Sequence, residues 1–192
     1  MEQLDVLYAI ADLFEKYHIP YLLTGSFASS YYAHPRSTHD IDLILEVNQT
    51  GQSKIEQALK ELGNSYIIPF NHIDQVMKIK GQFNISHEET STKVDFWVAE
   101  SEQFEKEYQR RRISNMDNHH IPLISAEDLL LKKLTWCKEV FSEKHLRDCV
   151  GIWEVQKKNL DKIYLRSEAK KRHIEDLLLK IIEGKTNLGF SD

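Results

Sequence analysis

Two aspartates stand inside one short apolar strand, and this stretch constrains the chain more than any other. The segment Tyr21–Val47 reads YLLTGSFASSYYAHPRSTHDIDLILEV, and its second apolar run carries Asp40 and Asp42. Because successive side chains of a strand point to opposite faces, both carboxylates project from the same face. Like charges at that distance repel each other, so the pair is unfavourable unless a cation lies between them. The sequence therefore predicts a divalent metal ion beside this strand.

The first apolar run of the segment leads into a glycine-serine turn. Residues 21–24 are predicted to form a buried strand, and Gly25 and Ser26 turn the chain into a helix over residues 27–33, which ends before Pro35. Glycine lets the backbone approach a ligand closely, and a helix N-terminus favours phosphate. A Gly-Ser turn is also an ordinary way to begin a helix, so this turn alone does not decide between the two roles.

The rest of the first 124 residues predicts a mixture of helices and strands. Apolar residues at helical spacing predict helices over residues 2–17, 51–62 and 101–110. Apolar runs or alternation predict strands over residues 40–47, 65–70 (SYIIPF), 75–86 (QVMKIKGQFNIS), 92–98 and 120–124. A polar turn is expected at residues 115–118. In the run TKVDFWV, Asp95 projects from the face opposite to Val94 and Phe96. A third acid therefore lies on a second strand.

From Ser125 onward nearly every segment predicts helix. Ser125 is an N-cap followed by acidic residues, and helices are expected over residues 126–141, 144–156 and 167–183. Arg147 and Asp148 are expected to form a structural ion pair. The predicted fold class is α+β: a mixed sheet with flanking helices over residues 1–124, followed by a C-terminal helical lobe over residues 125–192.

Charge and apolar content exclude some classes of protein. The chain has 25 Lys and Arg against 30 Asp and Glu, a net charge of −5, which argues against a general nucleic-acid coat protein. Residues 1–124 carry 11 basic and 18 acidic residues, whereas the remainder carries 14 and 12. No apolar run approaches the roughly 20 residues of a membrane span, and the N-terminal sequence lacks the features of a signal peptide, so we expect a cytoplasmic protein with no membrane partner. Cys137 and Cys149 lack metal-ligand spacing and are expected to be reduced thiols.

The spacing of the motifs resembles that of a known superfamily. Gly25-Ser26, thirteen intervening positions, and Asp40-Ile41-Asp42-Leu43 resemble the signature of the polymerase-beta-like nucleotidyltransferases. The Arg36-Ser37-Thr38 element before the aspartates is similar to the Arg-x-Thr element of one branch of this superfamily. That branch holds the AbiEii-type toxin nucleotidyltransferases and the small-molecule antibiotic nucleotidyltransferases. His34 departs from the glycine that relatives often have before Pro35 and Arg36.

The resemblance implies a reaction and assigns roles to the residues that match its motif. It implies transfer of a nucleoside monophosphate from a nucleoside triphosphate (NTP) to an acceptor hydroxyl, assisted by two Mg²⁺ ions. Asp40, Asp42 and Asp95 are then the catalytic residues and metal ligands. Gly25, Ser26, Arg36 and Thr38 are the implied NTP-binding residues. From the helix that follows Ser125, either Lys132 or Lys133 could reach the phosphates; the two point about 100° apart, and we choose Lys132.

The sequence leaves the acceptor open. We place first the toxin-like acceptors that the resemblance allows, tRNA or a protein side chain, and a toxin would have a cognate antitoxin as partner. A nucleotidyltransferase that acts on a small hydroxylated compound such as an antibiotic is the competing enzyme. A nucleotide-binding or antitoxin-like module without catalytic activity is the alternative of a different class, although such a module would have no reason to keep Asp95.

Overall fold

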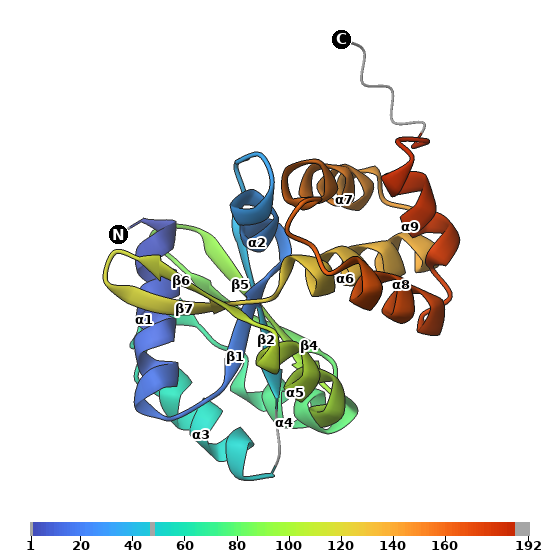
Figure 1. Cartoon of the computed structure of the whole chain (residues 1–192). Helices are drawn as coiled ribbons and strands as arrows, with labels where there is room; N and C mark the ends of the chain where they lie inside the picture. Colours follow the sequence, from blue (N-terminus) through green and yellow to red (C-terminus); the bar gives the residue numbers. More distant parts are fainter. Residues whose placement is uncertain (1, 47–48, 187–192) are drawn as a thin grey trace. The chain divides into compact units, whose positions relative to one another are not determined.

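The computed structural model describes residues 2–46 and 49–186 and has the predicted α+β class (Figure 1). Within these residues the strands are β1 (Tyr21–Thr24), β2 (Asp40–Glu46), β3 (Tyr66–Ile67), β4 (Gln82–His87), β5 (Thr92–Ala99), β6 (Arg112–Met116) and β7 (His119–Leu123). The helices are α1 (Gln3–Lys16), α2 (Gly25–Tyr32), α3 (Gln49–Lys60), α4 (Phe70–Ile79), α5 (Ser101–Gln109), α6 (Ala126–Glu139), α7 (Glu143–Gln156), α8 (Lys162–Lys171) and α9 (Glu175–Ile182). Val47, which the sequence places at the end of the second strand, lies outside the described residues.

The strands form one mixed sheet in the order β3-β4-β5-β2-β1-β7-β6. The pairs β2–β5 and β1–β7 are parallel, and the other neighbouring pairs are antiparallel. The predicted mixed sheet with flanking helices is therefore confirmed. Its centre is the pair β2–β5, which joins strands that lie about fifty residues apart in the chain.

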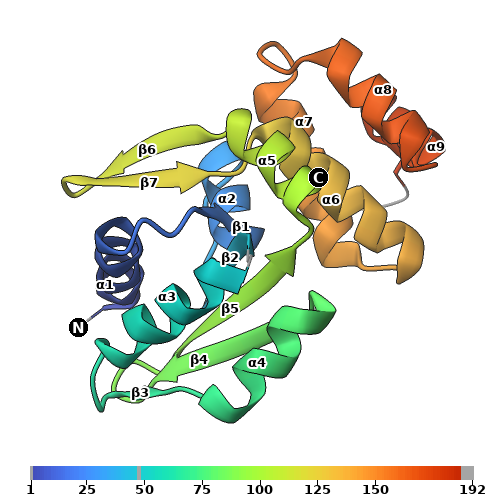
Figure 2. The same ribbon diagram turned by 90° about the horizontal axis from the view of Figure 1, so that it is seen from below.

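The two faces of this central part of the sheet differ in chemistry. Residues of β2, β4 and β5 that point to one face are apolar and buried: Ile41, Leu43, Leu45, Phe83, Ile85, Val94, Phe96 and Val98. Helix α1 packs on this face, where the ring of Phe14 lies 6.0 Å from that of Phe96. Helices α1 and α3 lie side by side (Figures 1 and 2). The opposite face of the same strands carries the aspartates.

Several elements of the first 124 residues differ from the prediction. The strand expected over residues 65–70 is only β3 (Tyr66–Ile67), and the strand β6 was not predicted. Residues 75–80 were expected in a strand but belong mostly to α4, because Ile73 and Met77 are buried one helical turn apart and Lys80 ends the helix in the left-handed conformation. The predicted turn at residues 115–118 is shorter, since β6 runs to Met116. Asp117 and Asn118 alone turn the chain, both with positive φ as a two-residue hairpin of this type requires.

The chain divides into two compact units. The first comprises Met1–Phe27 with Ser37–Ile124, and the second comprises Ala28–Arg36 with Ser125–Asp192. The predicted division into domains 1–124 and 125–192 stays a prediction, and the compact units differ from it in the place of residues 28–36. Among the helices of the described residues, none combines the length and apolar composition that a membrane span requires.

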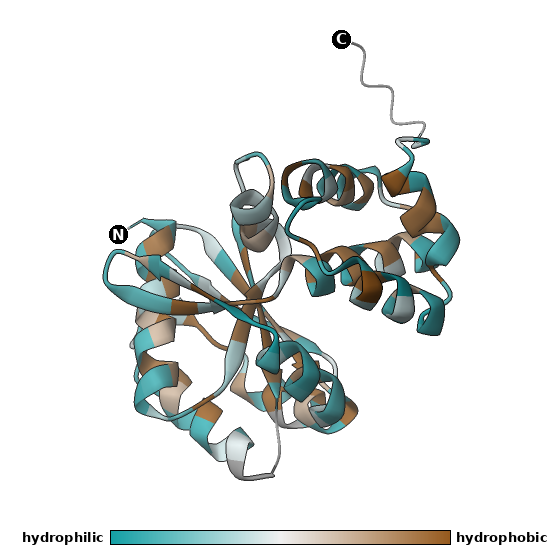
Figure 3. Cartoon of the chain, viewed as in Figure 1, coloured by the Kyte–Doolittle hydropathy of each residue, from teal (hydrophilic) through white to brown (hydrophobic). Residues whose placement is uncertain are grey.

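The second unit is helical, and its core is built from one apolar side of each helix. Brown and teal residues accordingly alternate along α7, α8 and α9 in Figure 3. The single helix predicted over residues 167–183 is wrong. Asp161 caps α8 by accepting hydrogen bonds from the backbone N–H groups of Ile163 and Tyr164, and the chain breaks again at His173, which has a φ of 55°. Cys137 and Cys149 are free thiols, as expected.

A buried cluster of charged side chains stabilises the second unit. Asp148 accepts hydrogen bonds from Nε and Nη2 of Arg36, at 3.1 and 3.0 Å, and from Nζ of Lys133 at 2.8 Å. The hydroxyl of Ser29 also donates to Asp148, at 3.3 Å. The expected Arg147–Asp148 pair is therefore wrong, because Arg147 pairs with Glu143 one turn earlier on the exposed side of α7.

Burial and charge act on Asp148 in opposite directions. Burial alone would raise the pKa of this carboxyl, but the hydrogen bonds from Arg36 and the charge of Lys133 outweigh it and lower the pKa. The ionised carboxylate is the form that Lys133, almost wholly buried, requires as its partner.

We predict that Asp148→Asn lowers the free energy of unfolding of the protein by about 3 kcal/mol, because it leaves the ammonium of Lys133 buried without a carboxylate. Lys133→Met, which has a similar volume and leaves Asp148 paired with Arg36, should lower it by less than about 2 kcal/mol. Urea unfolding followed by circular dichroism measures both.

The difference in the free energy of unfolding between wild type and Asp148→Asn should depend on pH. Since the folded pKa of Asp148 lies below its unfolded value, its contribution is complete above about pH 4 and is lost as the pH falls through the folded pKa. A difference that stays constant from pH 7 to pH 3, or an equal loss in Lys133→Met and Asp148→Asn, would contradict this account of the cluster.

Candidate active site

The parallel pairing of β2 and β5 brings two of the predicted acids together. Asp42 lies directly opposite Asp95, and Asp40 lies opposite Lys93, so all four side chains share one face of the sheet. Asp40 is exposed, Asp42 is half-buried and Asp95 is buried. The acids therefore lie across adjacent strands in the polar face of the first unit.

Gly25 follows β1 and lies against Asp42. Thr24 is the β1 residue opposite Asp42, and Gly25 then takes a positive φ of 65°. A Cβ atom on Gly25 would lie only 1.8 Å from Oδ2 of Asp42. The turn thus needs glycine for its backbone conformation and for the close approach of the carboxylate.

Both oxygens of Asp95 are engaged by neighbouring side chains. Nε2 of Gln82 donates to Oδ1 at 2.9 Å. Nζ of Lys93 lies 2.8 Å from Oδ1 and 2.9 Å from Oδ2. The hydrogen bond with Asp95 raises the pKa of Lys93, burial opposes this shift, and the charges of Asp95, Asp40 and Asp42 add to it. The ammonium of Lys93 is thus the cation of the acidic cluster in this structure.

Asp42 has an aromatic neighbour. Nε1 of Trp97 donates a long hydrogen bond to Oδ1 of Asp42, at 3.4 Å. Sequence reasoning did not assign Lys93 or Trp97 to the site. The signal was present, because Lys93, Asp95 and Trp97 alternate along TKVDFWV and must share one face of their strand.

The donor set suits a hard divalent cation. Asp40, Asp42 and Asp95 lie on one face of the sheet. Mg²⁺ binds carboxylates of this kind together with phosphate oxygens and water. Gly25 packs directly against one of them, Asp42. In the described part of the chain, no three or more His, Cys, Asp or Glu side chains lie close enough together to hold one metal ion. At Asp95 the place of a cation is taken by the Lys93 ammonium.

The remaining predicted residues fall in both units. Ser26 is buried at the start of α2, and the hydroxyl of Thr38 donates to the backbone oxygen of Asp40 at 3.3 Å, so both belong to the first unit. Arg36 and Lys132 belong to the second unit, where Arg36 is held by Asp148 and Lys132 is half-buried on α6. The roles assigned to these residues stay predictions.

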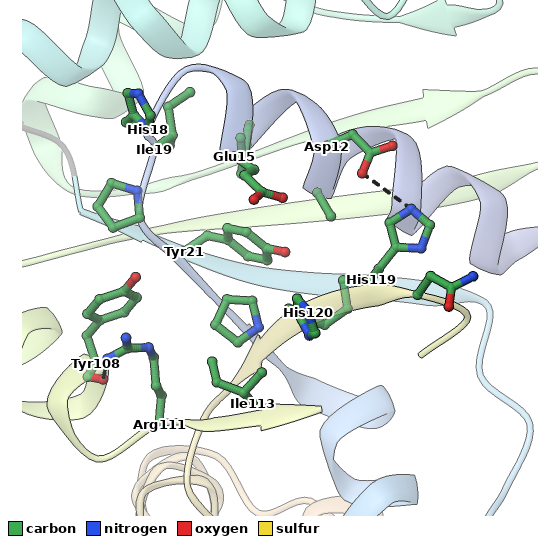
Figure 4. Close-up of a pocket in the computed structure, with 16 residues that line it drawn as sticks. Asp12, Glu15, His18, Ile19, Tyr21, Tyr108, Arg111, Ile113, His119 and His120 are labelled. Carbon is green, nitrogen blue, oxygen red and sulfur yellow. Dashed lines mark hydrogen bonds and ion pairs between the residues drawn. The ribbon is translucent and has the colours of Figure 1, made fainter. Parts of the chain in front are cut away.

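A separate groove of about 770 Å³ lies in the first unit between the end of α1 and the β6–β7 hairpin (Figure 4). Tyr21, Tyr108 and Arg111 lie along it, and an ion pair of 3.3 Å between Asp12 and His119 stands at one end. It contains none of the predicted site residues.

The arrangement of strands and helices is that of a nucleotidyltransferase fold. Solved structures agree with this assignment. The antibiotic-resistance factor ANT(2'')-Ia, in a solution structure, is 15% identical, with a TM-score of 0.61 over 96% of this chain and 98% of its own. The lincosamide antibiotic adenylyltransferase LnuA, bound to lincomycin, is 19% identical, with a TM-score of 0.52 over 78% of this chain and 95% of its own. A nucleotidyltransferase-like protein from Paracoccidioides brasiliensis is 17% identical, with a TM-score of 0.56 over 92% and 90% of the two chains.

The sequence itself gives the family. Residues 6–148 match the model of the aminoglycoside-2''-adenylyltransferase family, and the chain belongs to this family of nucleotidyltransferases. No curated protein matches the chain by sequence. The resemblance to the polymerase-beta-like superfamily is thus confirmed.

We predict that Gly25→Ala lowers the free energy of unfolding by at least about 2 kcal/mol more than Gly63→Ala does. Both glycines have positive φ, but a Cβ on Gly63 meets no atom within 4 Å, whereas one on Gly25 collides with Asp42. Gly63→Ala is therefore the matched control for backbone strain alone. Equal losses in guanidinium unfolding would contradict the close packing of Gly25 on Asp42.

Proposed function

We propose that this protein is a Mg²⁺-dependent nucleotidyltransferase that moves a nucleoside monophosphate from an NTP to the hydroxyl group of an acceptor. The observation that carries the proposal is the direct pairing of Asp42 with Asp95, with the side-chain-free Gly25 against Asp42. Two carboxylates held in register on rigid neighbouring strands are a precise scaffold for divalent cations.

Each acid has its own role in this proposal. Asp40 and Asp42, on one strand, would hold the metal ions, and Asp95 would be the third ligand or take the proton of the acceptor hydroxyl. When bound, Mg²⁺ supplies charge that stabilises the attacking and leaving oxygens. Trp97 restricts Asp42 by its hydrogen bond, so the carboxylate is oriented before substrate arrives.

The residues around Gly25 suit the triphosphate. Gly25 and Ser26 begin α2, and the N-terminus of a helix favours negative charge. Thr38 lies beside the backbone of Asp40 and could donate to a phosphate oxygen. Arg36 is engaged by Asp148, so it would have to exchange a bond to that carboxylate for one to phosphate. Lys132, on α6 of the second unit, stays a candidate phosphate ligand from the resemblance alone.

For the acceptor, we propose a small polyhydroxylated compound of the antibiotic type. The family model names an aminoglycoside, and structures of similar fold contain adenylyl-2''-tobramycin and lincomycin. A tRNA or protein acceptor, with a cognate antitoxin, and a module without activity are the other outcomes of the experiment below.

We predict that the purified protein with Mg²⁺ and an α-labelled NTP labels a small hydroxylated acceptor from a panel of aminoglycosides and lincosamides. Asp42→Asn and Asp95→Asn should each lower the rate at least about 100-fold, because each removes a charged ligand of the proposed metal site. Asp176→Asn, at an exposed position in the first turn of α9, is the control that should leave the rate unchanged. Liquid chromatography with mass spectrometry measures the product.

The same reaction should be run with total cell extract as the acceptor source, followed by separation of RNA, protein and small molecules. Label in RNA or protein alone would replace the proposed acceptor and keep the reaction. Absence of label in every fraction, together with no thermal stabilisation by any NTP in the presence of Mg²⁺, would refute the nucleotidyltransferase proposal.

A further inference from the structure

The acidic cluster contains a basic residue that the proposed reaction does not use. Lys93 stands two positions before Asp95 on β5 and opposite Asp40 on β2. Its ammonium lies within 2.9 Å of both oxygens of Asp95. The charges of Asp40 and Asp42 also act on it. One side chain therefore neutralises part of the charge of all three acids.

A metal ion bound to the oxygens of Asp95 would compete with the ammonium of Lys93. Its Oδ1 accepts from Gln82 and contacts Lys93, and its Oδ2 accepts from Lys93. Gln82 is neutral and could remain beside a metal-bound carboxylate. The ammonium is a positive charge, and it would repel a divalent cation at a distance of a few ångströms.

Lys93 and Asp95 differ in their freedom to move. The side chain of Asp95 is 7% exposed, whereas that of Lys93 is 43% exposed. The long lysine side chain can thus swing toward solvent by changing rotamers, while the aspartate is held in the sheet.

From these contacts we propose that Lys93 is a displaceable counter-cation, a positioning residue that holds Asp95 in the metal-free protein and is expelled when a divalent ion binds. The inference rests on the proposed function, because it assumes that the carboxylates bind metal. Lys93 holds the buried carboxylate of Asp95 in a fixed orientation before the ion arrives. It also weakens the binding of metal alone, because each ion must first displace the ammonium.

The test is titration of the full-length protein with Mn²⁺ alone, followed by electron paramagnetic resonance of the free ion. Lys93→Met should bind Mn²⁺ about tenfold more tightly than wild type, because the competing charge is gone. Lys93→Arg keeps the charge and should bind no more tightly than wild type. Lys78→Met, at an exposed position on α4, is the control for loss of a lysine elsewhere in the first unit and should leave the affinity unchanged.

The outcomes separate this inference from the proposed function. A merely structural role for Lys93 would lower or leave unchanged the Mn²⁺ affinity of Lys93→Met, and either result overturns the inference while the metal site stands. If no variant, including wild type, binds Mn²⁺ with or without ATP, the metal site and the inference fall together.

A second measurement uses the wild-type protein and does not depend on the folding of a variant. The rate at which an amine-reactive acetylating reagent modifies Lys93, followed by mass spectrometry of peptides, should rise severalfold when Mn²⁺ is added. Lys78 is the internal reference. A rate for Lys93 that does not change at Mn²⁺ concentrations that saturate the protein would overturn the displacement.

Discussion

The parallel pairing of β2 with β5 is the interaction on which the candidate site depends. It aligns Asp42 with Asp95 and Asp40 with Lys93, and it places the apolar partners Ile41 and Val94 on the opposite face. A shift of one residue in this register would bury the aspartates under α1 and expose the apolar face. The hydrophobic core therefore fixes the geometry of the carboxylates, because the same register satisfies both faces of the sheet.

The antiparallel pairing of β1 with β2 adds the second constraint. It places Thr24 opposite Asp42, so the chain leaves the sheet and enters α2 directly beside the carboxylate. Only a residue without a side chain fits there, because any Cβ would overlap Oδ2 of Asp42. The Gly-Ser motif and the Asp-x-Asp motif are thus one structural unit: the spacing between them is the length of chain that α2 and its return to the sheet require.

Sequence reasoning recovered the parts of this arrangement that local patterns encode. Alternation along DIDLILE and TKVDFWV was enough to place the three acids on strands and to orient them. It failed where tertiary packing overrides local preference, as in residues 75–80. Their partial alternation of apolar and polar residues suits a strand, but Ile73 and Met77 are buried on one side of α4. The partners of Asp148 could not be found either, because Arg36 and Lys133 lie far from it in the sequence and their pairing needs the folded second unit.

The two units differ in how they stabilise a buried aspartate. Each buries an aspartate, and each pairs it with a lysine at 2.8 Å. Lys133 is 1% exposed, so loss of the carboxylate of Asp148 would leave its ammonium buried with no solvent to compensate. Lys93 is 43% exposed, so water can replace its contact with Asp95 at little cost. A buried lysine fixes the position of its carboxylate partner in the core. A half-exposed lysine can move into solvent, so that another cation binds the carboxylate. The same pair of residue types is therefore structural in the helical unit and suited to ligand exchange in the sheet.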